Sequence, residues 1–387
     1  MAHDRQPKPK SVAVFASGIT NLARLTSDYH LELDPIPESF ARMQFFLREI
    51  GQGPKGARNL TREEAREALS LIIGQEVARA QMGGFLLIQR FKGESPEELY
   101  GFTEAVREGA NLIRPKVEGL LDVGSPYDGR KRSIVVSPAS SIVAAACGVP
   151  VVMHGEKGLG PKHGVPVGDV LEALGLDVDA EPEAVASSIE AKGFGYMHSS
   201  RFVPDVYALA DLREEIALRS CLSTIEKIYN LAGADYSIIG LTHLPYMNKM
   251  MTAATNMGFN RILIVQGIEG NEDVPTSRPC RAFIWEKTTG ESTEFRIDAS
   301  EYGLQPATKE EMAAGDPAEN AAIALRVFDG EPGGHRDLVL LNAGVRIWLT
   351  ERAETIEDGI AIAREAIDSG TAKAKLDALQ TLQIVGD

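Results

Sequence analysis

Residues 133–155 read SIVVSPASSIVAAACGVPVVMHG, and this stretch decides the fold class. A β-branched run at 133–137 leads into a helical segment rich in alanine, and a second β-branched run follows at 149–153. The runs YSIIGL at 236–241 and RILIVQG at 261–267 have the same character and are also followed by helical or glycine-rich segments. Short buried strands that alternate with helices predict a mostly parallel sheet with crossover helices.

The region before this sheet has a helical pattern. Thr61 precedes an amphipathic run and has Glu64 three residues later, which is a capping box. Ser95 followed by Pro96 marks a second helix start, because proline is tolerated in the first helical turn. Residues 204–230 are also helical by their spacing, and we expect them to return to this helical unit.

The expected architecture is therefore α/β, with a small all-helical domain and a larger α/β domain that has a mostly parallel central sheet. A chain of 387 residues is long enough for two domains. The later part also contains a predicted β-hairpin, RAFIWEKTTGESTEFRI at 281–297, with its turn at TTGES. We predict an N-terminal extension at residues 1–42, a helical domain at 43–118 and 204–232, and an α/β domain at 119–203 and 233–387.

Composition limits the possible partners and compartment. The formal net charge of −15 argues against nucleic acid and anionic membranes as partners, since both require a dense positive field. The three cysteines are far apart and lack metal-site spacing, which fits a reducing compartment. Without an apolar run near the ~20 residues of a membrane span, or an apolar core in the first residues, the sequence predicts a cytoplasmic protein.

Three of the predicted strands end in loops with binding chemistry. The helix that opens at Ser137 has free backbone N–H groups and could bind an anion, although simple helix capping explains the same residues. The glycine-rich loop after His154 carries Lys157 and Lys162. The third loop, QGIEGNED, places Glu272 and Asp273 together, and hard carboxylate oxygens suit Mg²⁺ unless the loop is only a solvated acidic turn.

A fourth loop, GSPYDGRKR at 124–132, looks like an ordinary turn when it is considered alone. Gly124 and Gly129 give its backbone freedom, and three consecutive cations at 130–132 could meet a phosphate. Ligands of open α/β sheets gather at the carboxyl ends of the strands, where all four loops are expected. The four loops together predict a site for a magnesium-bound phosphorylated substrate.

Several segments in order resemble the anthranilate phosphoribosyltransferases of glycosyltransferase family 3. They are FLLIQRFKGESPEELYGFTEAV, AAACGVPVVMHG, DVLEALG, DLREEIALRS, GDPAENAA, LLNAG and AREAIDSGTAKAKLDAL. The resemblance runs from about residue 43 to the end. It implies a helical domain beside an α/β domain, transfer of a ribosyl group from phosphoribosyl pyrophosphate, Mg²⁺ as cofactor and a homodimer.

The resemblance also assigns roles to individual residues. Glu272 and Asp273 take the place of the family's metal-binding pair, and His154 and Arg213 lie on the acceptor side as the catalytic candidates. The phosphate-binding or substrate-binding candidates are these eight residues: Gly124, Ser125, Asp128, Gly129, Ser137, Gly155, Lys157 and Lys162. His154 could equally be a packed strand-end histidine, and Arg213 could simply pair with a nearby glutamate.

This chain departs from the family at the acceptor. Glu156 stands where the family has a neutral amide, so that a carboxylate would face the carboxylate of anthranilate and repel it. The PYDGR form of the phosphate loop indicates a divergent branch, some of whose members bind nucleic acid. The first hypothesis is a phosphoribosyltransferase with an acceptor other than anthranilate. The alternatives are a nucleoside-phosphorylase-like enzyme and a non-catalytic relative that binds nucleic acid or another macromolecule.

Overall fold

A computed structural model describes residues 36–53 and 55–380 of the chain. Its centre is one seven-stranded sheet with the order β3-β2-β1-β4-β5-β6-β7. Strands β1 to β5 are mutually parallel, and β6 and β7 form an antiparallel hairpin on the β5 edge. The strands are β1 Leu121–Gly124, β2 Val151–Gly155, β3 Phe194–His198, β4 Tyr236–Gly240, β5 Arg261–Val265, β6 Cys280–Glu286 and β7 Glu291–Ile297. The predicted mostly parallel sheet and its hairpin are confirmed.

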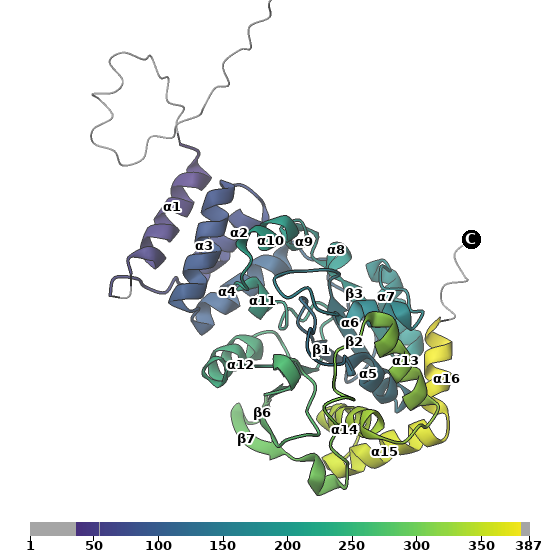
Figure 1. Cartoon of the computed structure of the whole chain (residues 1–387). Coiled ribbons are helices and arrows are strands. Elements are labelled where there is room, and N and C mark those ends of the chain that lie inside the picture. Colours follow the sequence, from purple (N-terminus) through teal and green to yellow (C-terminus); the bar gives the residue numbers. More distant parts are fainter. Residues whose placement is uncertain (1–35, 54, 381–387) are drawn as a thin grey trace, which may run out of the picture.

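The helices near the N-terminal end form the small helical unit. Four of them gather at one end of the molecule (Figure 1), namely α1 Glu38–Gly51, α2 Arg62–Ile73, α3 Arg79–Lys92 and α4 Pro96–Glu108. The predicted caps are confirmed, because the side chains of Thr61 and Ser95 accept from the backbone N–H groups of Glu64 and Glu98, respectively. Residues 1–35 of the predicted extension 1–42 lie outside the described residues. The last part of the extension is helical, because α1 begins at Glu38.

The remaining helices cover the two faces of the sheet. Alternate strand residues point to opposite faces, so that Leu263 packs in one buried cluster and Ile262 and Ile264 in the other. The first face is covered by α5 Ser137–Ala146, α6 Val167–Ala173, α13 Pro317–Phe328, α14 Gly334–Leu349, α15 Ile356–Asp368 and α16 Thr371–Gln380. The second face is covered by α7 Pro182–Lys192, α12 Met247–Thr255 and the helical unit.

The stretch 204–230, expected to be helical by its spacing, is helical but divided. That segment consists of short helices, α9 Pro204–Tyr207, α10 Ala210–Ile216 and α11 Leu222–Ile225, which follow α8 Ser199–Phe202. Ala217 ends α10 in the left-handed region, with φ of 54°, and this turns the chain. The buried apolar residues of the segment 204–230 belong to the same cluster as those of α1 to α4, so the segment does return to the helical unit.

The strand predicted at 133–137 is wrong. Residues 134–136 are irregular and buried, and their backbone N–H groups bond outside any sheet: Ile134 donates to the Met312 carbonyl and Val135 to the Asn320 side chain. The strand between β2 and β4 is instead β1, the short segment LDVG. Because Ser137 still begins α5, the predicted helix start keeps its place in the chain.

Candidate active site

The four predicted loops meet at the carboxyl edge of the parallel strands. Strand β1 ends at Gly124, β2 at Gly155 and β5 at Val265, and these strands run in the same direction. Direct contacts join the loops that follow them. The Ser125 hydroxyl donates to Glu272 Oε1 at 2.6 Å, and the Tyr127 hydroxyl lies 2.9 Å from His154 Nδ1. The GSPYDGRKR loop is therefore part of the site edge and is more than a surface turn.

A cleft of about 530 Å³ opens beside this loop, between the helical unit and the α/β unit. The helical unit contributes residues at the end of α3 and before α4, and the α/β unit contributes the loops after β4 and β5. Five cations line the cleft, namely Arg90, Arg132, Lys162, Arg219 and Lys227, together with the two carboxylates of Glu94 and Glu269. The cleft is therefore suited to a phosphorylated ligand, even though the whole chain is acidic.

Lys227 lies at the base of this cleft. Its ammonium donates to the carbonyls of Gly240 and Gly270, at 3.0 and 3.3 Å, and thereby joins the ends of β4 and β5. Burial lowers the pKa of Lys227 to about 8 and also lowers the pKa of Lys162. An anion that entered the cleft would favour the protonated form of both lysines.

The glycines of the phosphate loop allow close packing. Gly129 has φ of +67°, and a Cβ there would lie 2.5 Å from the Val165 carbonyl carbon. A Cβ at Gly124 would lie 2.7 Å from the Lys227 carbonyl oxygen, and one at Gly155 would lie 2.8 Å from the Tyr196 hydroxyl. These glycines are required by the surrounding chain, and a role toward a ligand stays a prediction.

The charged candidates fall into two groups. Asp128 pairs with Arg219 at 2.6 Å beside the cleft, and Lys162 lines the cleft and lies 3.6 Å from Glu269. Lys157, by contrast, is exposed and pairs with Glu172 of α6 at 2.7 Å, so the structure does not bring it to the other candidates.

The start of α5 is closed by protein side chains. Ser137 is fully buried, and its hydroxyl accepts from Arg346 Nη2 at 2.9 Å. Arg346 belongs to α14 and also pairs with Asp273. The Ser137 hydroxyl is therefore already hydrogen-bonded within the protein, and an anion site at this helix start stays a prediction.

The acceptor-side candidates are also bound internally. His154 lies with Nε2 at 3.1 Å from Asp122 Oδ1 and Nδ1 next to Tyr127, which agrees with the packed strand-end alternative. Arg213 is buried and pairs with Glu226 at 3.0 Å. Glu156 is buried nearby and accepts from the Ser199 hydroxyl at 2.9 Å, and burial raises the pKa of Glu156 to about 7.

Sequence reasoning missed several residues of the site. Arg219 and Lys227 occur in a stretch whose pattern is simply helical, which gave no signal. Arg346 did leave a signal, because it is a single arginine within the otherwise apolar segment GVRIWL. A charge at a core position of a helix requires a buried partner, and that partner is Asp273.

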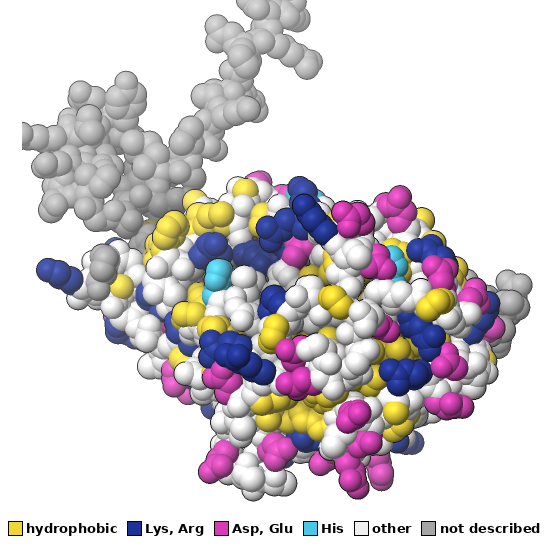
Figure 2. Space-filling view, turned by 60° about the horizontal axis from the view of Figure 1, so that its bottom comes forward, with side chains coloured by type: hydrophobic (Ala, Val, Ile, Leu, Met, Phe, Trp, Pro, Cys, Tyr) yellow, Lys and Arg dark blue, Asp and Glu magenta, His cyan; other side chains and the backbone are white. Residues whose placement is uncertain are grey.

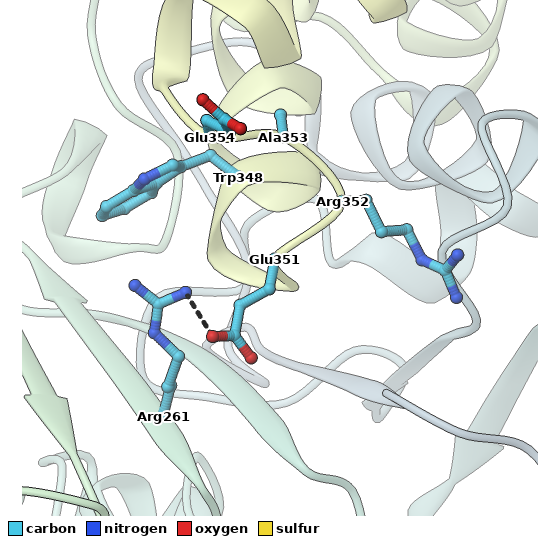
Figure 3. A pocket seen from close by; sticks show the side chains of 6 residues that line it. All are labelled: Arg261, Trp348, Glu351, Arg352, Ala353 and Glu354. Carbon is cyan, nitrogen blue, oxygen red and sulfur yellow. Dashed lines mark ion pairs between the residues drawn. The ribbon is translucent and has the colours of Figure 1, made fainter.

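A second hollow, of about 380 Å³, lies at the opposite edge of the sheet, where β5 begins (Figure 3). Arg261 lies 3.9 Å from Glu351 there and stacks on Trp348, with 5.3 Å from its guanidinium carbon to the ring centroid. None of the sequence-predicted site residues lines this hollow. The cleft at the carboxyl edge is therefore the candidate active site.

Fold and cleft define an α/β protein with a helical unit and a cleft lined by cations at the carboxyl edge of its sheet. Residues 123–373 match the family described as "Glycosyl transferase family, a/b domain", and residues 45–110 match its helical bundle domain. The chain belongs to this glycosyl transferase family, which includes the anthranilate phosphoribosyltransferases. No helix among the residues that the structure describes is long and apolar enough to cross a membrane.

Named relatives are similar over most of the chain. An anthranilate phosphoribosyltransferase of Methanocorpusculum labreanum is 36% identical over 82% of this chain and 92% of its own length. The Haloferax volcanii enzyme is 34% identical over 87% and 99%, respectively. The solved enzyme of Thermus thermophilus has a TM-score of 0.76 at 31% identity over 88% of this chain and 98% of its own. The Saccharomyces cerevisiae enzyme, solved in complex with PRPP and Mg, has a TM-score of 0.77 at 20% identity over 88% and 99%, a likeness of fold alone.

Proposed function

We propose that this protein is a pentosyltransferase that binds a phosphoribosyl pyrophosphate-like sugar and transfers its ribosyl group to a nitrogen acceptor other than anthranilate. The observation that carries this proposal is the cluster of five cations in the cleft of an acidic chain. Positive charges there would stabilise the pyrophosphate that departs when the sugar carbon becomes oxocarbenium-like. The family to which the chain belongs supports the same donor.

Mg²⁺ is the cofactor that this proposal includes. Glu272 fits a hard cation, because its Oε2 is buried and has no hydrogen-bond partner among the described residues. When bound, the ion would neutralise charge that develops on the leaving pyrophosphate. The chain's own cations, Arg132 and Lys162 above all, would orient the phosphates from the cleft side.

The acceptor pocket argues against anthranilate. By the resemblance, Arg213 lies on the acceptor side and would face a substrate carboxylate, but it already pairs with the Glu226 carboxylate at 3.0 Å. Glu156 adds a second acidic group nearby. A substrate carboxylate would have to break the buried pair of Arg213 and Glu226, which costs on the order of the 3–5 kcal/mol known for broken buried pairs. We therefore propose an acceptor without a carboxylate.

The internal ion pairs favour one second candidate function, in which the protein binds a phosphorylated ligand without turning it over. Internal ion pairs at both Arg213 and Asp273 leave fewer free groups for catalysis. The two candidates differ in product formation and share ligand binding. A subcellular location in the cytoplasm and a homodimeric state stay predictions from the sequence.

Thermal unfolding tests the proposal. Phosphoribosyl pyrophosphate with Mg²⁺ should raise the Tm, because a ligand that binds only the folded state stabilises it. The double variant Arg132→Met, Lys162→Met should lose this shift, while Lys157→Met, an exposed lysine outside the cleft, should keep it. Inorganic phosphate in a parallel arm tests the nucleoside-phosphorylase alternative, which predicts that phosphate stabilises as well as the sugar pyrophosphate.

The acceptor is tested by product formation. Anthranilate should neither add to the Tm shift nor be consumed in the presence of phosphoribosyl pyrophosphate, as followed by its fluorescence. A panel of aromatic nitrogen bases and amines without a carboxylate should contain a compound that releases pyrophosphate. Rapid consumption of anthranilate would contradict the pocket argument, and binding without turnover across the panel would favour the non-catalytic candidate.

A further inference from the structure

Glu269 is a carboxylate in a cleft that is otherwise rich in cations. It lies in the turn η3 Ile268–Gly270, after β5, and its side chain lines the cleft between the helical unit and the α/β unit. Its backbone has φ of 52°, in the left-handed region that residues other than glycine rarely adopt. Such a conformation is unfavourable by itself, and it is found mostly where the surrounding structure holds a side chain in place for binding.

The two oxygens of Glu269 have different surroundings. Oε1 accepts from the Arg132 backbone N–H at 2.9 Å and from the Ser133 hydroxyl at 2.7 Å. Oε2 is buried and has no hydrogen-bond partner among the described residues. Burial by itself would raise the pKa of Glu269, but the hydrogen bonds from Ser133 and Arg132, with Lys162 nearby, lower this pKa. Oε1 therefore fastens the end of the phosphate loop, whereas Oε2 is a charged acceptor without a donor.

Two cations stand beside Oε2 without a hydrogen bond to it. Lys162 Nζ and Arg132 Nε each lie 3.6 Å from Oε2, beyond the usual N–H···O range of about 2.7–3.2 Å. The Arg132 side chain is 81% exposed and that of Lys162 is 23% exposed, so both have room to turn toward a phosphate in the cleft. A phosphate that attracted these two cations would uncover Oε2 for another part of the same ligand.

An acceptor oxygen beside phosphate-binding cations matches a sugar phosphate. An ionised phosphate oxygen has no proton to donate and would be repelled by the carboxylate, whereas a sugar hydroxyl donates to it. In a phosphoribosyl pyrophosphate-like sugar, one hydroxyl stands on the carbon next to the carbon that bears the pyrophosphate. The two groups of the ligand are thus as close together as Oε2 and its neighbouring cations. Acidic side chains also recognise ribose hydroxyls in dinucleotide-binding folds.

We infer that Glu269 is a specificity-determining residue, which accepts a hydrogen bond from a sugar hydroxyl through Oε2 while Arg132 and Lys162 hold the adjacent phosphate. The cleft then prefers phosphates of hydroxylated sugars to phosphates without a hydroxyl group. This inference rests on the proposed function for the sugar pyrophosphate, and it names the part of that ligand that Glu269 recognises.

Two phosphate esters that differ only in their ring hydroxyls test the inference on the full-length protein. They are ribose 5-phosphate and tetrahydrofurfuryl phosphate, in which hydrogen replaces every ring hydroxyl. Isothermal titration calorimetry measures the Kd of each ester. We expect ribose 5-phosphate to bind at least about 10-fold more tightly, which is the order of one hydrogen bond to a charged group. Equal affinities of the wild type for the two esters would overturn the inference.

Two variants of Glu269 assign the preference to this side chain. Glu269→Gly permits the positive φ and removes the carboxylate, and it should bind the two esters equally well. Glu269→Gln keeps an oxygen for Ser133 and the Arg132 backbone and should lose most of the preference. Both variants should bind inorganic phosphate at least as tightly as the wild type, because a repelling charge is gone.

Glu94→Gln is the matched control, because Glu94 is a second buried carboxylate of the same cleft. Its Oε2 already accepts from the Tyr246 hydroxyl at 3.1 Å, so this variant should keep the preference for ribose 5-phosphate. All variants are checked for folding by circular dichroism. A wild-type preference in a folded Glu269 variant, or its loss in Glu94→Gln as well, would overturn the inference. The glutamine variant decides the matter if the glycine variant does not fold.

The same ligands separate this inference from the proposed function. Binding of phosphoribosyl pyrophosphate without a preference between the two esters would overturn the role of Glu269 and leave donor binding intact. A clear preference for ribose 5-phosphate without any binding of phosphoribosyl pyrophosphate would contradict the proposed function and leave a sugar-phosphate site. Absence of binding by all three ligands would contradict both.

Discussion

Arg213 and Glu226 carry the proposal about the acceptor. Their ion pair is almost fully buried, with side chains 6% and 3% exposed. Glu226 also accepts from the Tyr127 backbone N–H at 3.2 Å, which links the acceptor side to the phosphate loop. A carboxylate supplied by the protein itself thus stands where the resembled enzymes would need room for that of the substrate.

Glu156 should make stability depend on pH. Burial raises its pKa in the folded state to about 7, above the usual value of 4.5, so the folded protein keeps a proton that the unfolded chain releases. Stability is therefore greatest below pH ~4.5 and is lost as pH rises toward 7, by at most about 1.4 kcal/mol per pH unit from this group. Urea unfolding of the wild type and of Glu156→Gln at about pH 5 and pH 7 measures this contribution.

The amide variant should lose less stability between these two pH values than the wild type does. Glu172→Gln serves as the control, because Glu172 is exposed on the neighbouring helix α6. Equal pH dependence in the wild type and Glu156→Gln would show that Glu156 is ionised throughout this range.

At the scale of elements, glycine decides how closely helices cross. Gly101 of α4 lies against α2, and a Cβ there would lie 2.2 Å from the Arg62 carbonyl oxygen. Gly83 of α3 has open space around it, because a Cβ there would have its nearest neighbour, an atom of Leu212, at 4.0 Å. Packing therefore requires glycine at position 101 and does not require it at position 83.

Alanine at these two positions should act in opposite directions. Gly101→Ala should lower the free energy of unfolding by about 1–3 kcal/mol, because the added methyl group forces α2 and α4 apart. Gly83→Ala should raise it by up to about 1 kcal/mol, since alanine favours the helix and meets open space. Chemical denaturation of both variants checks the pair, and equal effects would contradict the close crossing of α2 and α4.

At the scale of the whole molecule, charge is distributed unevenly. The chain has a formal net charge of −15, yet its cleft is lined by five cations. On the face that Figure 2 shows, Lys and Arg side chains of the described part occur in small groups among Asp and Glu side chains. A small anion is thus attracted locally, while a long polyanion would be repelled by much of the remaining surface.

Binding of nucleic acid should accordingly be weak and sensitive to salt. If all five cleft cations contact phosphates, the affinity for a single-stranded oligonucleotide should fall on the order of 100-fold between about 50 and 200 mM salt. Fluorescence anisotropy with a labelled oligonucleotide measures this slope. Arg132→Met, Lys162→Met should flatten it and Lys157→Met should not. Tight binding at physiological salt would contradict the prediction and favour the macromolecule-binding alternative.

The sequence by itself determined the classes of element and much of their order. Capping boxes, β-branched runs and the hairpin turn act through neighbours within a few residues, so that Thr61, Ser95 and the strands β2, β4 and β5 were predictable. The strand predicted at 133–137 was wrong, because apolar residues indicate that a segment is buried but do not indicate which groups its backbone bonds to. The short strand β1 was missed for the same reason: its identity depends on hydrogen bonds to both β2 and β4.

The tertiary structure alone decided which charged residues are free to meet a ligand. The sequence placed Glu272 and Asp273 side by side and could not tell them apart. Arg130 and Arg346 lie 143 and 73 residues from Asp273 in the chain, and folding brings both to its carboxylate. Glu226 reaches Arg213 in the same way, across the turn at Ala217. Whether a carboxylate is free to bind a ligand depends on the cations that folding brings next to it. A buried charge must be paired, and its partner can be far away in the sequence.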